Sequence, residues 1–380
     1  MKRILFTHGH LIVDGNREYE DGALLINGET IEDVFINSNH LKDDLGEYEE
    51  IDLKGNIVMP GFFDTHSHGA FGADYNKASL NEIDEASKKL LQKGTCSFLT
   101  TLTGNAGLER QLEDLGGLEC DGARFLGIHL EGPFINRKYK GAIAEDFIRD
   151  ADKDELKKLL TSSKLIRQIT LAPELEGISG IVKLLNEEGI RVMLGHSDAL
   201  AKNCEGLAYD GFTHLFNAER PFGHRDLSLV NLALDEGDRY TEIIADGIHI
   251  DKTVLKLVLK NIRKDRLILV SDSMYLAGCE DGECIFEGER CIKEGRKCYR
   301  EKDGRLAGGA AFLIDGVRTM HEVGASLTDL LLMSSLNACR LYGLDSRFGS
   351  LEKGKYADIV VLDGNLDLIY IYARGKTVDA

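Results

Sequence analysis

Eight short apolar segments, most of them followed by an amphipathic stretch, constrain the fold of this chain more than any other feature. Each segment is nearly continuously apolar, as a strand is when both of its faces are buried. The segments are Ile57–Phe63, Cys96–Thr101, Phe125–Leu130, Gln168–Ala172, Arg191–Leu194, Gly211–Phe216, Thr241–Ala245 and Arg266–Val270. This alternation predicts an α/β protein built on a (β/α)8 TIM barrel.

The amphipathic stretches between these segments are expected to form the outer helices of the barrel. They include Leu80–Lys93, Lys153–Leu160, Ile178–Glu188, Ala199–Ala208 and Thr253–Ile262.

The two ends of the chain show strand patterns instead. Ile4–Glu50 alternates apolar and polar residues around Asp-Gly and Asn-Gly turns, and Asp358–Lys376 repeats that pattern. We therefore expect residues 1–55 and 346–380 to form one small β-sandwich domain. Residues 56–345 are expected to form the catalytic barrel, with a hairpin insertion near residues 279–306.

Charge and composition exclude several classes of function. The formal net charge is −18, which disfavours a nucleic-acid binder. The apolar stretches are too short to span a bilayer, and the first residues lack the apolar segment of a signal peptide, so we expect a cytoplasmic protein. Its eight cysteines are then expected to be reduced. Cys279, Cys284, Cys291 and Cys298 lie close together in sequence, and we expect them to act as small apolar residues rather than as metal ligands.

Histidines and carboxylates follow most of the predicted strands, where a barrel carries its active site. They are His66, His68, His129, Glu131, Glu174, His196, Asp198, His214, Asp246, His249 and Asp272. His66 and His68 are two residues apart in an extended segment, so both can reach one cation. Together with Glu131, His196, His214 and Asp272 they make a ligand set for one or two divalent ions, with Zn²⁺, Fe²⁺ or Mn²⁺ as candidates.

The same segments resemble a known family. Pro60–Gly69 resembles the opening motif of the amidohydrolase superfamily, and Gly354–Leu362 resembles its closing motif. His129–Phe134 and Thr213–Ala218 are similar to motifs of one branch, the N-acetylglucosamine-6-phosphate deacetylases. Further matches are Leu171–Glu174, Gly195–Ala199, Ala245–His249 and Val270–Met274.

The resemblance implies a role for each matching residue. His66 and His68 would bind one metal ion, and His196 and His214 would bind the other or the only one. Glu131 would bind either ion or bridge them, and Asp272 would be the general base and then the general acid. The alternative that Asp272 is only a ligand stays open.

The resemblance also implies a phosphate pocket, which an acidic chain would need in order to bind an anionic substrate. His224, Arg225 and His249 would contact the sugar phosphate, with help from the backbone of Asn217 and Ala218. It further implies a homodimer. From the residues alone, an exposed His-Arg pair would be a solvated surface pair.

Two departures from the family pattern fall on the substrate side. Ile143 stands where the family has a histidine that contacts the acyl group. Glu219 and Arg220 place two charges beside Asn217 and Ala218, where the family has Met at the position of Glu219.

The function that these observations favour is the hydrolysis of N-acetylglucosamine 6-phosphate to glucosamine 6-phosphate and acetate. The alternatives are a related amidohydrolase acting on N-acetylgalactosamine 6-phosphate or on another N-acyl or cyclic amide. A third possibility, from another class, is a catalytically silent barrel that senses a sugar phosphate.

Overall fold

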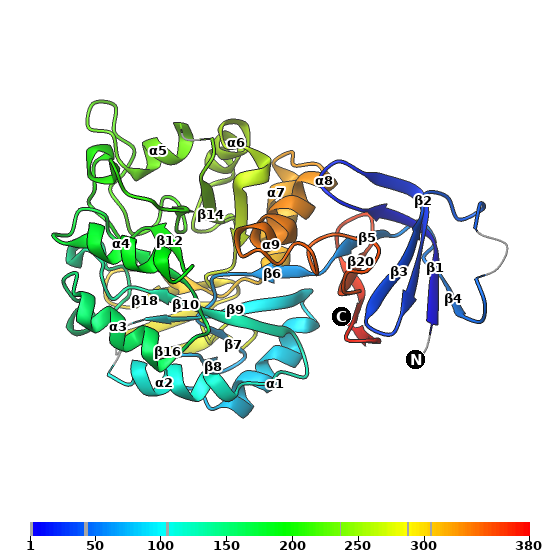
Figure 1. Ribbon diagram of the computed structural model, residues 1–380, viewed down its shortest axis with the longest axis horizontal. Helices are drawn as coiled ribbons and strands as arrows, with labels where there is room; N and C mark the ends of the chain where they lie inside the picture. The colour runs from blue at the N-terminus through cyan, green and yellow to red at the C-terminus, as the bar shows by residue number, and fades with distance from the viewer. Residues whose placement is uncertain (1–2, 42–44, 104–105, 236, 287–288, 305) are drawn as a thin grey trace.

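Eight parallel strands form the centre of the larger part of the molecule (Figure 1). The computed structural model describes residues 3–41, 45–103, 106–235, 237–286, 289–304 and 306–380. The eight strands are β6 (Phe62–Asp64), β9 (Thr95–Thr103), β10 (Arg124–Glu131), β11 (Ile166–Leu171), β12 (Arg191–Leu194), β13 (Gly211–Phe212), β14 (Tyr240–Ile244) and β15 (Leu267–Val270). They pair in chain order from β6 to β15. A backbone hydrogen bond from Asp272 N to His66 O (2.9 Å) and a parallel bridge between Ser67 and Ser273 join the first and last strands, so the sheet is a nearly closed barrel.

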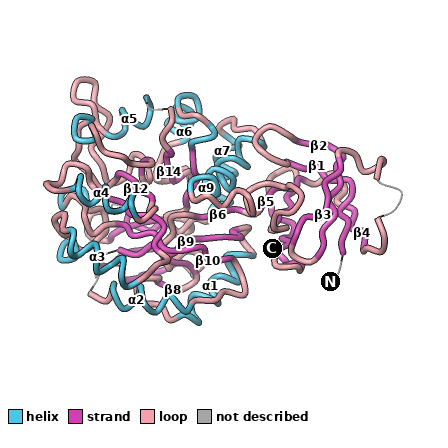
Figure 2. Tube along the Cα trace, in the orientation of Figure 1, coloured by secondary structure: helices cyan, strands magenta, loops and turns pink. Residues whose placement is uncertain are grey.

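Helices surround these strands, as Figure 2 shows. They are α1 (Leu80–Leu91), α2 (Leu108–Asp114), α3 (Lys153–Ser162), α4 (Ile178–Glu187), α5 (Leu229–Asp235), α6 (Lys252–Asn261), α7 (Leu313–Glu322), α8 (Leu327–Leu331) and α9 (Asn337–Leu341). Among the described residues, no helix combines the length and the apolar character that crossing a membrane requires. The (β/α)8 fold class is confirmed.

Helix α1 illustrates how the sequence fixes such an element. Ser79 caps it, because its hydroxyl accepts a hydrogen bond from Glu82 N while the Glu82 carboxylate accepts one from Ser79 N. Ile83, Ala86 and Leu90 recur at helical spacing and are buried against the barrel.

Some predicted elements differ in the structure. The helix expected over Ala199–Ala208 is only a short 3-10 turn, Ala201–Cys204, because the backbone at Leu200 and Ala201 pairs with the neighbouring loop at Ser228 and Leu227. The strand expected over Ile57–Phe63 is divided. Its first part, β5 (Ile57–Pro60), pairs with terminal strands, and only its second part, β6, enters the barrel.

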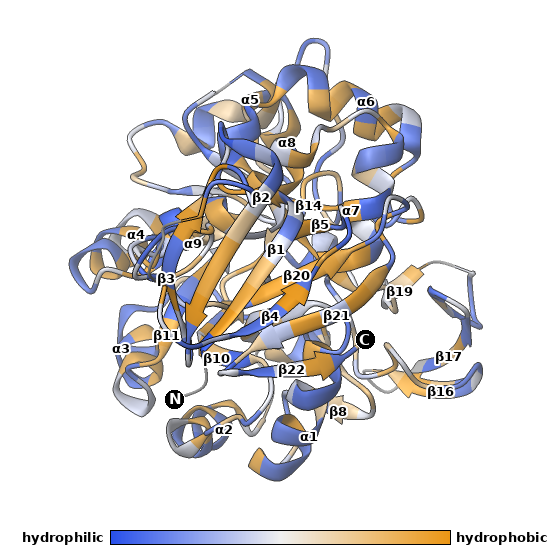
Figure 3. Cartoon of the chain, turned by 90° about the vertical axis from the view of Figure 1, so that its right-hand side faces the viewer, coloured by the Kyte–Doolittle hydropathy of each residue, from blue (hydrophilic) through white to orange (hydrophobic). Residues whose placement is uncertain are grey.

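Strands from both chain termini form one mixed sheet beside the barrel (Figure 3). They are β1 (Arg3–Ile12), β2 (Glu18–Asn27), β3 (Thr30–Phe35), β4 (Glu49–Asp52), β5, β20 (Ile359–Leu362), β21 (Leu368–Ala373) and β22 (Lys376–Asp379). Phe6 on β1 contacts Tyr372 on β21, with ring centroids 5.9 Å apart, although two strands lie between them in the sheet. The sheet is therefore strongly curved around its own apolar core. The exact domain boundaries stay a prediction.

A four-stranded antiparallel sheet follows β15. Its strands are β16 (Gly282–Phe286), β17 (Glu289–Glu294), β18 (Lys297–Arg300) and β19 (Leu306–Gly309). The predicted insertion near 279–306 falls here, although residues 287–288 and 305 lie outside the described part of the chain. Cys291 and Cys298 are buried in an apolar cluster with Met274 and Ala307. No grouping of metal-ligating atoms among the described residues includes a cysteine. A short hairpin, β7 (Gly69–Ala70) and β8 (Ala73–Asp74), follows β6.

Candidate metal centre and active-site pocket

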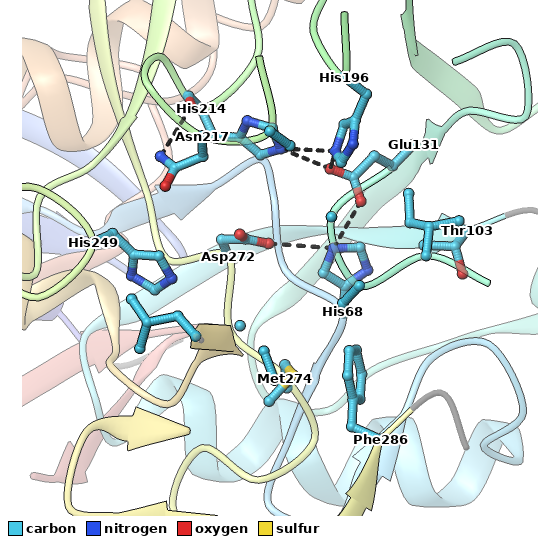
Figure 4. A pocket seen from close by; sticks show the side chains of 17 residues that line it. His68, Thr103, Glu131, His196, His214, Asn217, His249, Asp272, Met274 and Phe286 are labelled. Carbon is cyan, nitrogen blue, oxygen red and sulfur yellow. Dashed lines mark hydrogen bonds and ion pairs between the residues drawn. The ribbon is translucent and has the colours of Figure 1, made fainter. Parts of the chain in front are cut away.

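A pocket opens at the carboxyl ends of the barrel strands (Figure 4). It is lined by His68, Thr103, Glu131, Gly141, Ala142, Ile143, His196, His214, Asn217, Ala218, His249, Asp272, Met274, Phe286, Leu306, Ala307 and Gly308. Most of the predicted site residues therefore meet in one place. His66 lies just beneath them and is completely buried.

The backbone at three strand ends turns abruptly to aim side chains into this pocket. His196, His214 and Asp272 follow β12, β13 and β15, and they have φ values of 48°, 29° and 48°. A residue other than glycine adopts this left-handed conformation at a cost of about 1–3 kcal/mol and keeps it only where the surrounding structure enforces it. The strand expected over Gly211–Phe216 ends at Phe212 for the same reason.

Two imidazole nitrogens and a carboxylate oxygen converge at one side of the pocket. The Nδ1 of His196 donates a hydrogen bond to the carbonyl oxygen of Tyr139 at 2.8 Å, and this bond directs Nε2 toward Glu131 and His214. This Nε2 lies 2.9 Å from Glu131 Oε1 and 3.1 Å from His214 Nε2, and His214 Nε2 also lies 2.9 Å from Glu131 Oε1. Burial lowers the pKa of His214, which favours its neutral form. Imidazole nitrogens and a carboxylate oxygen at such short separations are suited to binding a divalent cation.

A second group adjoins the first. His66 Nε2 and His68 Nε2 lie 3.4 Å and 3.2 Å from Asp272 Oδ1. Glu131 connects the two groups, because its Oε2 lies 3.2 Å from His68 Nε2 and its Oε1 lies 3.3 Å from His66 Nε2. Two sets of ligating atoms are close enough to share an ion, namely His66, Glu131 and His214, and His66, His68 and Asp272. These buried groups fit the binding of divalent metal.

The carboxylates in this cluster are ionised. Burial raises the pKa of Glu131, but His196 and His66 lower it by more, so the pKa is well below its usual value. Burial also raises the pKa of Asp272, but His66 and His68 have the larger effect and lower it to about 2. Although burial lowers it, the pKa of His68 is raised to about 9 by Asp272 and Glu131. These opposite charges stabilise each other, and a divalent cation bound here would take the place of the His68 proton.

Other groups that line the pocket are suited to an anion. Asn217 and Ala218 line it at a turn that the Asn217 amide fixes by donating to the carbonyl oxygen of His214 at 3.0 Å. His249 Nδ1 lies 2.8 Å from Asp246 Oδ2. Although burial lowers it, the pKa of His249 is raised by this bond to Asp246, which favours an imidazolium facing the pocket.

Two predicted residues lie elsewhere. His224 and Arg225 are exposed on the loop before α5 and are not among the residues that line the pocket of their own chain. Phe222 and Leu227 on the same loop are also strongly exposed, at 59% and 49%.

The residues that depart from the family pattern have distinct positions. Ile143 lines the pocket and is 6% exposed, in contact with an apolar cluster that includes Ile135 and Ile148. Glu219 points inward, where its Oε1 accepts a hydrogen bond from Phe216 N at 2.5 Å and burial raises its pKa to about 8. Arg220 pairs with Asp198 at 2.8 Å. Glu219 and Arg220, expected to place two charges beside the site, therefore do not line the pocket.

Other polar residues at the strand ends support the scaffold. Glu174 accepts hydrogen bonds from Asn136, Ser197 and the backbone N of Asp198. His129 contacts the hydroxyls of Thr101 and Thr170 inside the barrel.

Sequence reasoning missed two contributors. Met274 and Phe286 make an apolar wall beside His68 (Figure 4). Ala307 also lines the pocket, so part of its apolar lining comes from the β16–β19 sheet. Glu242 is fully buried on β14, and its Oε2 lies 3.5 Å from His66 Nδ1. A single glutamate within the apolar segment Thr241–Ala245 was the available signal.

A barrel with histidines and carboxylates at its strand ends is typical of metal-dependent hydrolases, and the similarity to known proteins agrees with this class. The model of the amidohydrolase family matches residues 57–378, so the chain belongs to this family. The N-acetylglucosamine-6-phosphate deacetylase of Bacillus subtilis (strain 168) is 37% identical over 333 residues, which cover 84% of each chain. Within the amidohydrolases, the chain is therefore a member of the N-acetylglucosamine-6-phosphate deacetylase family.

Two further proteins extend this comparison. The N-acetylgalactosamine-6-phosphate deacetylase of Escherichia coli O157:H7 is 32% identical, over 84% of this chain and 87% of its own. A solved structure of a variant N-acetyl-D-glucosamine-6-phosphate deacetylase from Mycobacterium smegmatis, in complex with N-acetyl-D-glucosamine-6-phosphate, is 25% identical. It superposes with a TM-score of 0.90 over the full length of both chains.

Proposed function

We propose that this protein hydrolyses N-acetylglucosamine 6-phosphate to glucosamine 6-phosphate and acetate, with one or two divalent ions held by His66, His68, Glu131, His196, His214 and Asp272. The observation that carries the proposal is the convergence of His196 Nε2 and His214 Nε2 on Glu131 Oε1, in a pocket that His249 also lines. The Bacillus subtilis relative at 37% identity supports the choice of substrate.

The chain's own residues perform the proton transfers in this mechanism. A divalent ion bound here would polarise the acyl oxygen and lower the pKa of water, which makes water a nucleophile near neutral pH. Asp272 lines the pocket as a carboxylate, so it can accept a proton from the attacking water. It then returns that proton to the departing nitrogen, since an amine leaves far more readily than its anion. His249 and the backbone at Asn217 and Ala218 hold the phosphate end of the substrate.

The choice of substrate is tested by acetate release from three compounds. Metal-loaded protein should act on N-acetylglucosamine 6-phosphate in preference to unphosphorylated N-acetylglucosamine. Preference for N-acetylgalactosamine 6-phosphate would favour the second candidate, which the 32% identity to the Escherichia coli enzyme motivates. Turnover of neither phosphate, but of an N-acyl amino acid or a cyclic amide, would contradict the proposal. Ile143 is the first residue to examine in that case, because it lines the pocket and cannot donate a hydrogen bond.

Arg225 should bind substrate phosphate across a homodimer. This part of the proposal is supported by the exposure of His224 and Arg225 outside their own pocket and by the apolar Phe222 and Leu227 that flank them. Arg225→Ala should raise KM for the phosphorylated substrate about 10–100-fold, which corresponds to the loss of a charge-assisted hydrogen bond, and should leave kcat nearly unchanged. Steady-state kinetics with Arg220→Ala as the neighbouring-arginine control checks this, and an unchanged KM in Arg225→Ala refutes it. Sedimentation at equilibrium should show a dimer.

Substrate binding should weaken as pH rises through the raised pKa of His249. The sign follows from the direction of the shift: the imidazolium persists above the usual value of 6.5 and is lost at higher pH, while the substrate phosphate is nearly fully ionised above about pH 7. Asp246→Asn removes the carboxylate that raises this pKa, so the rise of KM with pH should begin at lower pH. Matching KM profiles for the wild type and Asp246→Asn would show that His249 does not act as a cation.

A further inference from the structure

We propose that Glu242 is a positioning residue for His66, whose imidazole it holds with a protonated Nδ1 and with Nε2 directed at the metal site. This inference rests on the proposed function, because it takes His66 to be a metal ligand. Glu242 does not line the pocket, so it acts on the reaction only through His66.

One oxygen of the Glu242 carboxylate is fixed by two donors. Its Oε1 accepts hydrogen bonds from Gln168 Nε2 at 3.0 Å and from Thr65 Oγ1 at 3.2 Å. The orientation of the Gln168 amide is itself determined, because its Oε1 accepts a hydrogen bond from the Tyr342 hydroxyl at 2.6 Å. The amide NH₂ must therefore face residue 242, which selects a hydrogen-bond acceptor at that position.

The other oxygen faces His66. Glu242 Oε2 makes no hydrogen bond with any described residue, and neither does His66 Nδ1, yet the two atoms lie 3.5 Å apart and both side chains are completely buried. A buried carboxylate oxygen without a partner is costly, and 3.5 Å is only slightly longer than an N–H···O bond. A small movement completes the bond if Nδ1 carries the proton.

This arrangement matters because a histidine can bind a cation only through a nitrogen with a free lone pair. With the proton held on Nδ1 by Glu242, the lone pair is on Nε2, the atom that lies 3.3 Å from Glu131 and 3.4 Å from Asp272. A carboxylate behind a ligating imidazole also raises its basicity, and removing such a partner typically weakens metal binding 10–100-fold. His66 belongs to both groups of ligating atoms, so the effect reaches the whole centre.

The variant Glu242→Gln separates positioning from packing. Its amide oxygen can still accept from Gln168 and Thr65, whereas its NH₂ then faces Nδ1–H, so donor meets donor. Titration of the apo-protein with Zn²⁺ should give a dissociation constant 10–100-fold higher than that of the wild type, and the visible spectrum of the Co²⁺-loaded protein should change.

The matched control is Tyr342→Phe, which removes a hydroxyl at the far end of the same buried chain without touching His66. It should lower the melting temperature but leave the Zn²⁺ affinity within about twofold of the wild-type value. Equal Zn²⁺ affinities in Glu242→Gln and the wild type, or equal weakening in both variants, would overturn the positioning role alone. Absence of Zn²⁺ binding by the wild type would instead overturn the proposed metal centre.

A measurement on the wild type serves if Glu242→Gln does not fold. Long-range ¹H–¹⁵N correlation spectra of the Zn²⁺-loaded protein should show His66 with a protonated Nδ1. A proton on Nε2 of His66 would overturn the proposal.

Discussion

The variant Asp272→Asn should lower kcat about 10³-fold or more while the protein stays folded. A 10³-fold decrease corresponds to the loss of about 4 kcal/mol of transition-state stabilisation. The reason is chemical. Asp272 is a carboxylate with a pKa of about 2, and an amide of the same shape cannot accept a proton from water or return it to the leaving nitrogen. Because phosphate and sugar contacts lie elsewhere in the pocket, KM should change little. Steady-state kinetics and a far-UV circular dichroism spectrum provide the measurement.

The matched control for this variant is Asp64→Asn. Asp64 is another buried carboxylate at the same edge of the barrel, where its Oδ1 accepts a hydrogen bond from Ser271 N at 3.2 Å, but it does not line the pocket. Burial raises the pKa of Asp64 to about 6, so its neutral form is already accessible, and the variant should stay within about tenfold of wild-type kcat. Full turnover by Asp272→Asn would remove Asp272 from the mechanism.

Replacing Glu131 with Gln should remove metal from the whole centre. The Glu131 carboxylate contacts His196 and His214 through Oε1 and His68 through Oε2, so it is the point at which both groups meet. An amide there loses the negative charge and turns an N–H toward lone pairs. Metal content measured by elemental analysis should fall to a small fraction of the wild-type value, and kcat/KM should fall at least about 10³-fold.

The comparison variant is His68→Ala, which alters only one of the two groups. It should retain the metal ion held by His66, Glu131 and His214 and lose any ion held by the group of His66, His68 and Asp272. A wild-type metal content in Glu131→Gln would contradict the assignment of Glu131 as the shared ligand.

The barrel could be predicted because its signals are local. Nearly continuous apolar runs such as Leu267–Val270 are typical of strands buried on both faces, and the capped pattern of Leu80–Leu91 is typical of an amphipathic helix. The helix expected over Ala199–Ala208 was wrong because contacts with a distant loop, at Leu227 and Ser228, replace helical hydrogen bonds there. Tertiary contacts of this kind leave no local pattern.

The candidate site was predictable to a similar degree. Parallel strands end at one edge, which is why the sequence alone groups His68, Glu131, His196 and Asp272. The role of Glu242 could not be predicted, because it depends on which side chain of another strand lies beside it. The location of Arg225 likewise depends on the path of a long loop. The sequence predicts the groups that face the metal better than the groups behind them.

The most direct test of the proposed function is acetate release from N-acetylglucosamine 6-phosphate as a function of bound metal. The protein should be stripped with a chelator, dialysed and reloaded with Zn²⁺, Fe²⁺ or Mn²⁺ in separate samples. Stripped protein should show no turnover, and protein reloaded with at least one of these ions should turn over at about 1–10³ s⁻¹. Fully reloaded protein that releases no acetate, or stripped protein that turns over at the same rate, would contradict the proposed function.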